Sequence, residues 1–241
     1  MDWSPFDIIY EDESLVAMNK PCHILVHPTK ISEDTVSVLP LLEQQLDMRL
    51  FPIHRLDRPT SGVLLFAKSS AAAAHLSEQF RKQDVEKVYL AIVRGYVEEQ
   101  AVVDYAIGDP DDKSKPKRDA VTHYTRLAQS EVPYAINKYP QSRFSFVKAM
   151  PKTGRRHQIR RHFAHLRHPI MGDKRHGDIK YNKFFLKKWG WNRLFLHAYS
   201  LSFLHPNNHQ LIHLEASLNQ DFVAALERLL LNKGLEKMEK I

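Results

Sequence analysis

Apolar and polar positions along the chain predict short strands that alternate with helices. Two apolar runs, residues 8–10 and 15–18, flank a polar turn at residues 11–14 and predict a hairpin near the N-terminus. Further runs rich in β-branched and aromatic residues predict strands at residues 63–67, 88–93, 121–127 and 144–150. Helical spacing or strong helix formers predict helices at residues 35–46, 71–82 and 221–231. Pro40 marks an entry or kink in the first of these helices, and Ser69 or Ser70 offers an N-cap to the second.

A further helix is predicted after Thr153, which can serve as its N-cap. Ile159 and Phe163 then lie four residues apart on one apolar face, with Arg160 on a neighbouring face. Free backbone N–H groups and the helix dipole favour an anion at such an end. The cationic start of this helix therefore suits a phosphate group.

The excess of basic over acidic residues indicates that the protein binds a polyanion. Lysine and arginine number 35 against 28 aspartates and glutamates, which gives a net charge of +7 and a pI near 9.4. Nucleic acid is the commonest polyanion that such a surface binds. No apolar run approaches the roughly 18 to 20 residues that cross a bilayer, and no signal peptide is evident. We therefore expect a cytoplasmic protein without a membrane partner.

Length and cysteine content set the domain organisation. A chain of 241 residues with 43% hydrophobic residues can bury a sizeable core. We expect one catalytic domain over residues 1–241, with the charged residues 232–241 as a flexible tail. Cys22 is the only cysteine, so an intrachain disulfide and a multi-cysteine zinc site are excluded.

The densest polar chemistry lies at residues 54–62, directly before the apolar run at residues 63–67. Asp57 stands between Arg55 and Arg58, and opposite charges within a few ångströms favour the ionised form of a carboxylate. An ionised, partly desolvated carboxylate can act as a nucleophile or a base. The same residue types also fit a structural turn in which Asp57 caps the backbone and pairs with Arg58. Residue types alone leave both interpretations open.

A second polar cluster at residues 152–169 contains four histidines and five arginines. A metal site is disfavoured because no carboxylate or thiolate joins the histidines and no His-Glu-x-x-His motif occurs. The arginines would also repel a divalent cation. We expect no metal and no cofactor.

Both clusters resemble motifs of the RluA-type pseudouridine synthases. Residues 54–62 are similar to the family motif His-Arg-Leu-Asp-x-x-Thr-Ser-Gly, whose aspartate is catalytic, and Asp57 falls on that position. Residues 153–162 resemble the motif Thr-Gly-Arg-x-His-Gln-Leu/Ile-Arg-x-His. The resemblance implies that Arg160 pairs with the catalytic aspartate and that Ile159 packs beneath the base. Tyr89 matches a Lys-x-Tyr segment, in which the tyrosine packs against the target base and is the expected proton acceptor from the base carbon.

The resemblance runs from about residue 7 to residue 230. Residues 19–28 resemble the first family motif and include Lys20, but His23 replaces a glycine, which leaves the local backbone there an open question. Residues 169–173 and 193–198 continue the match, and His176 stands where many relatives have tyrosine. These features resemble most a branch that modifies uridine 65 of tRNA. Many relatives carry an N-terminal S4 RNA-binding module, which is not expected here.

The resemblance implies an α+β fold with a central, mostly antiparallel mixed sheet, flanking helices and an active-site cleft across the sheet. It also implies an isomerase that moves the glycosidic bond of a tRNA uridine from N1 to C5, with tRNA as partner and no obligate protein partner. The expected catalytic residues are Asp57, Tyr89 and Arg160. The expected RNA-binding residues are Arg55, Arg58, Thr60, Ile159, Arg155, Arg156 and Lys20.

Several alternatives stay open at this point. Asp57 could attack C1′ of the ribose or take a proton from C2′. The substrate could be ribosomal RNA, as for other branches of the family, or the protein could be an RNA-binding or chaperone protein with secondary catalysis. A metal-dependent nuclease is disfavoured by the lack of a carboxylate cluster.

Overall fold

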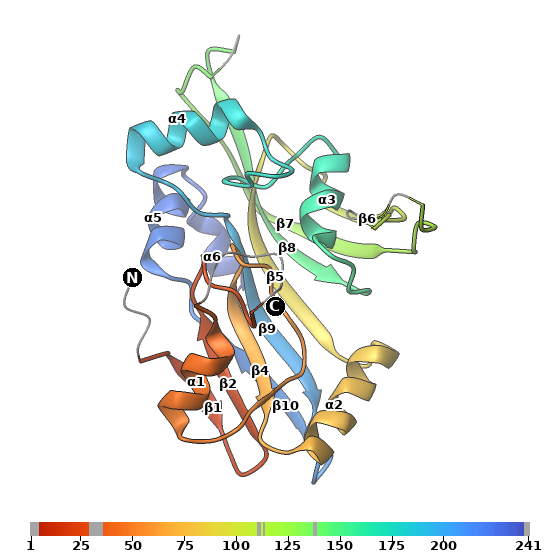
Figure 1. The fold of residues 1–241 in the computed structure, drawn as a ribbon. Coiled ribbons are helices and arrows are strands. Elements are labelled where there is room, and N and C mark those ends of the chain that lie inside the picture. Colours follow the sequence, from red (N-terminus) through yellow and green to blue (C-terminus); the bar gives the residue numbers. More distant parts are fainter. Residues whose placement is uncertain (1–4, 29–35, 110–111, 113, 137–138, 239–241) are drawn as a thin grey trace. The chain divides into compact units, whose positions relative to one another are not determined.

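The computed structural model describes residues 5–28, 36–109, 112, 114–136 and 139–238. The chain divides into two compact units, whose elements are drawn in Figure 1. Unit 1 comprises Met1–Lys87 and Ala198–Ser217, and unit 2 comprises Val88–His197 and Leu218–Ile241. Two of the boundaries fall inside strands β5 (Glu86–Arg94) and β9 (Leu196–Leu204). These two strands therefore run from one unit into the other.

Unit 1 is built on antiparallel strands. The hairpin predicted near the N-terminus is confirmed as β1 (Ile8–Glu11) and β2 (Leu15–Lys20). Strand β4 (Ser61–Ala67) pairs with β2, and the strand order in this unit is β1-β2-β4-β9. The short strand β3 (Phe51–Pro52) pairs with β4, and β10 (Leu211–Glu215) pairs with β9. All seven residues of β4 are buried, as a continuous apolar run predicts for a central strand.

Two helices belong to unit 1. Helix α1 (Val38–Leu46) begins after Ser37, so Pro40 lies in its first turn, where a backbone N–H has no partner within the helix. The start predicted at Thr35 lies outside the described residues. The side chain of Gln45 holds α1 to the residue before β1, because its Oε1 accepts from the Phe6 N–H at 2.7 Å and its Nε2 donates to the Phe6 carbonyl at 3.2 Å.

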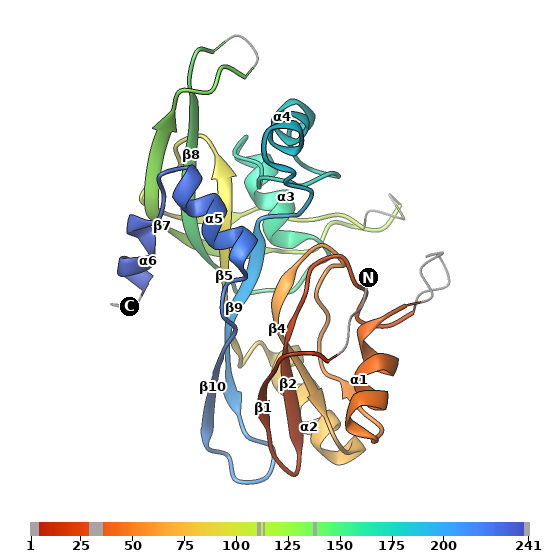
Figure 2. The same cartoon turned by 90° about the vertical axis from the view of Figure 1, so that its left-hand side faces the viewer.

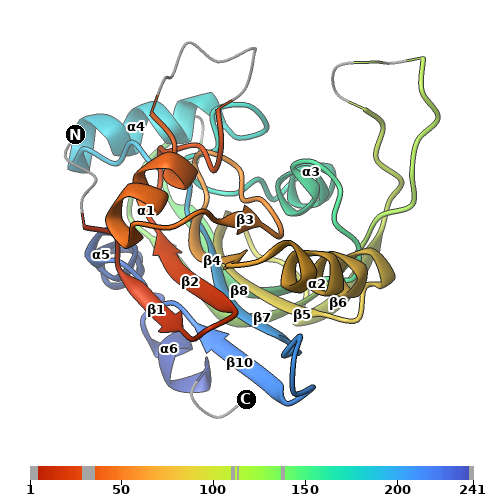
Figure 3. The same cartoon turned by 60° about the horizontal axis from the view of Figure 1, so that its bottom comes forward.

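Helix α2 (Ser70–Lys82) confirms the helix predicted after the Asp57 motif. The Oγ of Ser69 accepts from the Ala72 N–H at 3.2 Å, so the predicted serine cap is present. Ala72 and Leu76 pack into one apolar cluster with Val63 and Leu65 of β4. Figure 3 shows α2 lying along β3 and β4. The strand that carries the Asp57 motif is thus covered by the helix that follows it.

Unit 2 contains an antiparallel sheet in the order β5-β8-β7-β6. Its further strands are β6 (Gln100–Asp104), β7 (Val121–Val132) and β8 (Ser142–Pro151). Four helices flank these strands: α3 (Gln158–His165), α4 (Ile179–Trp189), α5 (Gln220–Arg228) and α6 (Lys233–Met238).

Alternate residues of β8 separate the helices of unit 2 into two layers. Val147 and Ala149 join Ile159 and Phe163 of α3 in one core cluster. Phe144 and Phe146 face the other side, where their rings lie 5.7 Å from Phe185 of α4 and 6.4 Å from Phe222 of α5, respectively. Figure 2 shows α3 on one side of β8 and α5 with α6 on the other.

Two local expectations differ from the structure. Thr153 does not cap α3: the N-cap residue is His157, with a φ of 57°, and it makes no side-chain cap bond. Instead, the Thr153 hydroxyl donates to Oε1 of Gln158 at 2.7 Å and accepts from the Val121 N–H at 3.0 Å. In the expected tail, residues Lys233–Met238 form α6, whose Gly234 packs against Phe146. Residues 239–241 lie outside the described residues.

Within the described part of the chain, no helix combines the length and the apolar content that a membrane crossing requires.

Candidate active site

Asp57 lies on a tight turn between β3 and β4 of unit 1. The Thr60 N–H donates to the Asp57 carbonyl at 2.9 Å and closes the turn. Asp57 is partly buried, Thr60 is 2% exposed, and Arg55 and Arg58 are exposed. The turn therefore presents the two arginines toward solvent while its far end is anchored in the core.

Lys20 holds this turn from beneath. Lys20 is wholly buried, and its Nζ donates to the carbonyls of Pro21 at 2.8 Å, Arg58 at 3.3 Å and Thr60 at 2.8 Å. We expected Lys20 among the RNA-binding cations, but these contacts are made to the protein's own backbone. Hydrogen bonds from an ammonium are charge-assisted and stronger than neutral ones. Lys20 therefore fixes the course of the Asp57 turn with a buried positive charge.

The backbone at His23, which the sequence left open, adopts a glycine-like conformation. It has a φ of 71°, in the left-handed region that glycine adopts most readily. The Nε of Arg58 donates to the His23 carbonyl at 3.2 Å. The backbone at residue 23 is therefore the one that a glycine would favour, at a cost on the order of 1–2 kcal/mol for a residue with a Cβ. Through Arg58, this strained residue is tied to the Asp57 turn.

Gly62 allows β4 to approach β9. Its φ is +113°, and a Cβ at this position would lie 2.1 Å from the Ala198 carbonyl oxygen. Because backbone rather than a flexible side chain occupies this space, no other residue fits. The glycine of the motif at residues 54–62 is thus required by packing.

His54 serves the turn as a hydrogen-bond acceptor. Its Nε2 accepts from the Leu65 N–H at 3.2 Å, and its ring stacks on Phe80 with centroids 5.0 Å apart. Burial, and then the nearby charge of Lys87, lower the pKa of His54 to about 4. A neutral ring is what this contact needs, because a protonated histidine has no acceptor nitrogen. His54 therefore positions the motif on β4.

Arg160 of unit 2 makes a buried, bidentate ion pair with Asp173. The Nε donates to Oδ2 at 2.7 Å and the Nη2 donates to Oδ1 at 2.8 Å, and the two side chains are 6% and 1% exposed. This geometry matches the planar fork of arginine to a carboxylate. The family resemblance pairs the Arg160 guanidinium with Asp57, but in the structure the Nε and Nη2 of that guanidinium bind Asp173.

Asp173 is itself held by backbone. Its Oδ1 also accepts from the N–H groups of Arg175 at 2.9 Å and His176 at 3.0 Å. Burial alone would raise the pKa of Asp173, but the bonds and charge of Arg160, together with these N–H groups, lower it. The Nδ2 of Asn182 on α4 donates to the Asp173 carbonyl at 2.9 Å. Asp173 is therefore an ionised anchor that orients Arg160.

Tyr89 and Ile159 lie on the same face of unit 2. Tyr89 is opposite Ala149 in the β5–β8 ladder, is partly buried, and packs against the cluster that contains Ile159 and Phe163. Ile159 is 6% exposed. Arg160 follows Ile159 directly on α3. Tyr89 and Ile159, which we expected to contact the target base, and the expected catalytic Arg160 thus all belong to unit 2.

Gln158 fixes the loop before α3. Its Oε1 accepts from Thr153 Oγ1 and from the Arg155 N–H at 2.9 Å, and its Nε2 donates to the Val121 carbonyl and to Thr122 Oγ1, both at 3.0 Å. The expected RNA contacts follow in this loop: Arg155 donates from Nε to the Asp119 carbonyl at 3.1 Å, and Arg156 is exposed.

Two of these supporting roles were missed by sequence reasoning. Asp173 and Gln158 both lie within the motif matches, at residues 169–173 and 153–162, so the resemblance marked their positions without giving their function. Among the described residues, no group of three or more His, Cys, Asp or Glu side chains could hold a metal ion.

Each unit thus holds one group of the expected site residues. Unit 1 brings together Asp57, Arg58, Thr60 and Lys20, and unit 2 brings together Tyr89, Ile159 and Arg160. The approach of Asp57 to Tyr89 and Arg160 stays a prediction.

The motifs that carry the two groups resemble those of a class of RNA-modifying isomerases, and the comparisons with known proteins show that the chain belongs to this class. The sequence profile described as RNA pseudouridylate synthase matches residues 14–165, and the chain belongs to this family. It is 48% identical over 224 residues to tRNA pseudouridine synthase C of Haemophilus ducreyi, covering 90% of this chain and 92% of the relative. The corresponding protein of Vibrio parahaemolyticus is 46% identical over 222 residues, covering 88% and 90%.

Solved structures give the same result for the fold. Human RNA Pseudouridylate Synthase Domain Containing 4 superimposes with a TM-score of 0.72 at 28% identity, over 93% of each chain. Human RNA Pseudouridylate Synthase Domain Containing 1 has a TM-score of 0.74 at 22% identity and covers 93% of this chain and 89% of the other. The predicted family and the predicted α+β class with a mostly antiparallel sheet are confirmed.

Proposed function

We propose that this protein converts uridine 65 of tRNA to pseudouridine. The observation that carries the proposal is the similarity of about nine-tenths of the chain to relatives described as tRNA pseudouridine synthase C. The net charge of +7 supports a polyanionic substrate. Uridine 65 follows from the resemblance to the tRNA-modifying branch of the family.

In the proposed reaction, the bond between N1 of uracil and C1′ of ribose breaks first. Positive charge develops at the sugar, as in glycoside hydrolysis, and the carboxylate of Asp57 stabilises it. Asp57 either bonds to C1′ or takes a proton from C2′. The freed uracil then turns, and C5 bonds to C1′ as the Asp57–C1′ bond breaks or, in the other route, as Asp57 returns the proton to C2′. Tyr89 accepts the C5 proton while N1 is protonated. No electrons are gained or lost, so the reaction needs no redox partner.

The support around these residues fits the proposed roles. Lys20 holds the Asp57 turn through three carbonyls, and Asp173 holds Arg160 through two side-chain bonds. Preorganised charge of this kind avoids reorganisation during the reaction. Arg160 would then present its remaining donors to Asp57.

The target base must leave its stack before it can react, which costs on the order of a few kcal/mol. A side chain that fills the vacancy offsets part of this cost. Arg55 is exposed and stands two residues before Asp57, and we assign it this role.

The test compares Asp57→Asn with Asp84→Asn, which makes the same change at an exposed carboxylate of unit 1. Purified proteins are incubated with tRNA that contains uracil labelled with tritium at C5. We expect Asp57→Asn to bind tRNA within several-fold of wild type but to release no tritium, and Asp84→Asn to behave as wild type. A tRNA with cytidine at position 65 should remain unmodified. Turnover by Asp57→Asn, or modification of ribosomal RNA alone, would contradict the proposal.

A further inference from the structure

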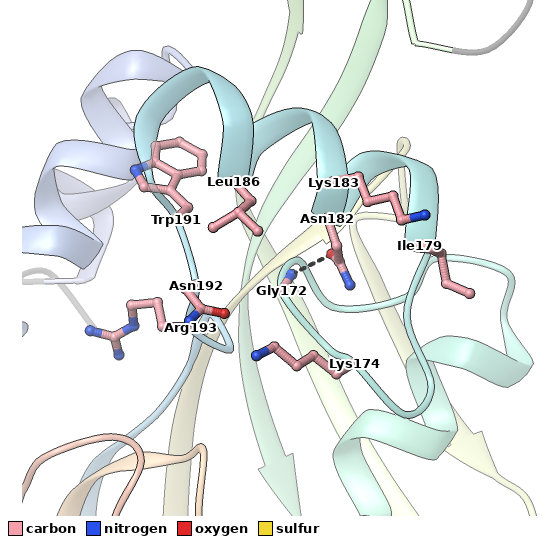
Figure 4. A pocket seen from close by; sticks show the side chains of 9 residues that line it. All are labelled: Gly172, Lys174, Ile179, Asn182, Lys183, Leu186, Trp191, Asn192 and Arg193. Atoms are coloured by element: carbon pink, nitrogen blue, oxygen red, sulfur yellow. Dashed lines mark hydrogen bonds between the residues drawn. The ribbon is translucent and has the colours of Figure 1, made fainter.

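A pocket of about 230 Å³ lies in unit 2, beside the loop that carries Asp173 (Figure 4). It is lined by Gly172 and Lys174 of that loop, by one face of α4, and by residues 191–193. The Gly172 N–H donates to Oδ1 of Asn182 at 3.0 Å, which ties α4 to the loop. Asp173, which binds Arg160, stands in the sequence between the lining residues Gly172 and Lys174, so the pocket and the anchor of Arg160 share one loop.

The walls of the pocket are apolar and exposed. Leu186 is 48% exposed and Ile179 is 65% exposed, although both belong to residue types that are commonly buried. Leu186 and Asn182 project from α4 toward the loop, with Trp191 beyond Leu186 (Figure 4). An indole beside an aliphatic side chain offers a surface on which a nucleobase can pack.

The rim of the pocket carries uncompensated positive charge. Lys174 and Lys183 line the pocket. On α4, Lys183 is flanked by Lys180 and Lys187, and this spacing of three and four residues places the three lysines on one side of the helix. All four lysines are exposed, and none forms an ion pair with any residue that the structure describes. Helix α4 contains no acidic residue.

The two acids nearest to these lysines in the sequence are already engaged: Asp173 is bound to Arg160, and Asp178 directly precedes α4. The Oδ1 of Asp178 caps α4 by accepting from the N–H groups of Lys180 and Tyr181, and its Oδ2 pairs with Arg94. The four lysines therefore attract an external anion without competition from the helix itself.

We propose that this pocket binds an unpaired nucleotide of the RNA substrate, with its phosphate on the rim that carries Lys174 and Lys183 and its base against Leu186 and Trp191. The inference rests on the proposed function, and it adds a contact that none of the sequence motifs assigns. The chemistry favours RNA because the cationic rim suits a phosphate and the apolar wall suits the base attached to it. The loop that lines the pocket with Gly172 and Lys174 also carries Asp173, which binds Arg160.

The test separates the charged contact from the apolar one. The double variant Lys174→Gln/Lys183→Gln is compared with Lys233→Gln/Lys237→Gln, which removes the same charge from exposed lysines of α6. Binding of tRNA is measured over a range of salt concentrations. We expect the pocket variant to bind about tenfold more weakly in low salt, with a slope of log affinity against log salt that is shallower by about one to two. The α6 variant should change the affinity by less than twofold.

Leu186→Ser tests the base contact. We expect it to weaken tRNA binding several-fold without changing the salt slope, because no phosphate contact is lost. Thermal unfolding of each variant checks that the fold is retained. Wild-type affinity in either pocket variant, or an equal loss in the α6 variant, would overturn the inference. If wild type forms pseudouridine in tRNA while pocket variants bind normally, only this inference fails. If wild type forms none while pocket variants bind weakly, the proposed function fails instead.

Discussion

Replacing Asp173 by asparagine tests the anchor of Arg160. The carboxylate accepts two bonds from the guanidinium and two from backbone N–H groups. An asparagine can keep its oxygen at the Oδ1 position, but its NH₂ group would then face the Nε–H of Arg160. The substitution therefore removes the compensating charge and sets two donors against each other.

The expected loss of stability is large because the pair is shielded from water. The side chains of Arg160 and Asp173 are 6% and 1% exposed, so solvent cannot replace the lost carboxylate. Breaking a buried pair in this way costs about 3–5 kcal/mol. For a chain of this length, each kcal/mol lowers the midpoint of thermal unfolding by about 2–4 °C. We therefore expect the midpoint of thermal unfolding to fall by about 6–20 °C.

A double-mutant cycle isolates the interaction. Unfolding free energies are measured by denaturant titration for wild type, Asp173→Asn, Arg160→Met and the double variant. We expect the unfolding free energy of the double variant to exceed the value predicted by adding the two single losses by at least about 2 kcal/mol. The reason is that the double variant no longer contains an uncompensated buried charge. The exposed pair Glu78–Arg81 on α2 supplies a control cycle, for which a far smaller coupling is expected. A coupling for Asp173 and Arg160 as small as that of the exposed pair would refute the reasoning.

The ion pair should also make the folding stability depend on pH. The pKa of Asp173 is lowered in the folded protein, so its contribution to stability is present above the unfolded value of about 3.8 and is lost as pH falls below it. The stability difference between wild type and Asp173→Asn should therefore narrow in acid below about pH 3.8.

Three further results are expected. His54→Gln keeps an acceptor for the Leu65 N–H but does not titrate. Between pH 6.5 and about pH 4 only the unfolded histidine binds a proton, so wild-type stability falls in this range and the fall should be smaller in the variant. Parallel stability curves for the two proteins would contradict this. Gly62→Ala should destabilise the protein by more than about 2 kcal/mol, because its Cβ would meet the Ala198 backbone. Gly154→Ala, whose Cβ meets nothing within 4 Å, is its control. Arg160→Lys should slow tRNA modification at least tenfold in single-turnover assays, because an ammonium cannot reproduce a bidentate contact with Asp173; a wild-type rate would contradict this.

The sequence predicted those elements in which local pattern and packing agree. The β1–β2 hairpin and the serine cap of α2 follow from alternation and from capping chemistry that acts within three residues. At Thr153 the same capping rule is wrong, because the side chain of Gln158 offers its hydroxyl a better partner. Local rules fail where a nearby side chain competes with the backbone.

Long-range contacts set the limit of prediction at the site. A lysine at the end of a strand is expected in solvent, yet Lys20 is wholly buried because carbonyls near residue 59 surround its ammonium. Likewise, no spacing rule joins Asp173 to Arg160, since a loop rather than a helix turn brings them together. The family resemblance covers the positions of both Lys20 and Asp173, but their contact partners became known only from the structure.

The enclosure of Lys20 makes this residue a chemical reporter of the Asp57 turn. Reagents that acylate amines react with accessible ammonium groups after deprotonation, and an amine with no exposed surface is protected until its surroundings open. In native protein, the labelling rate at Lys20 would measure how often the turn detaches from the core. A substrate RNA that clamps the turn would slow this labelling, whereas surface amines far from the RNA would keep their rates.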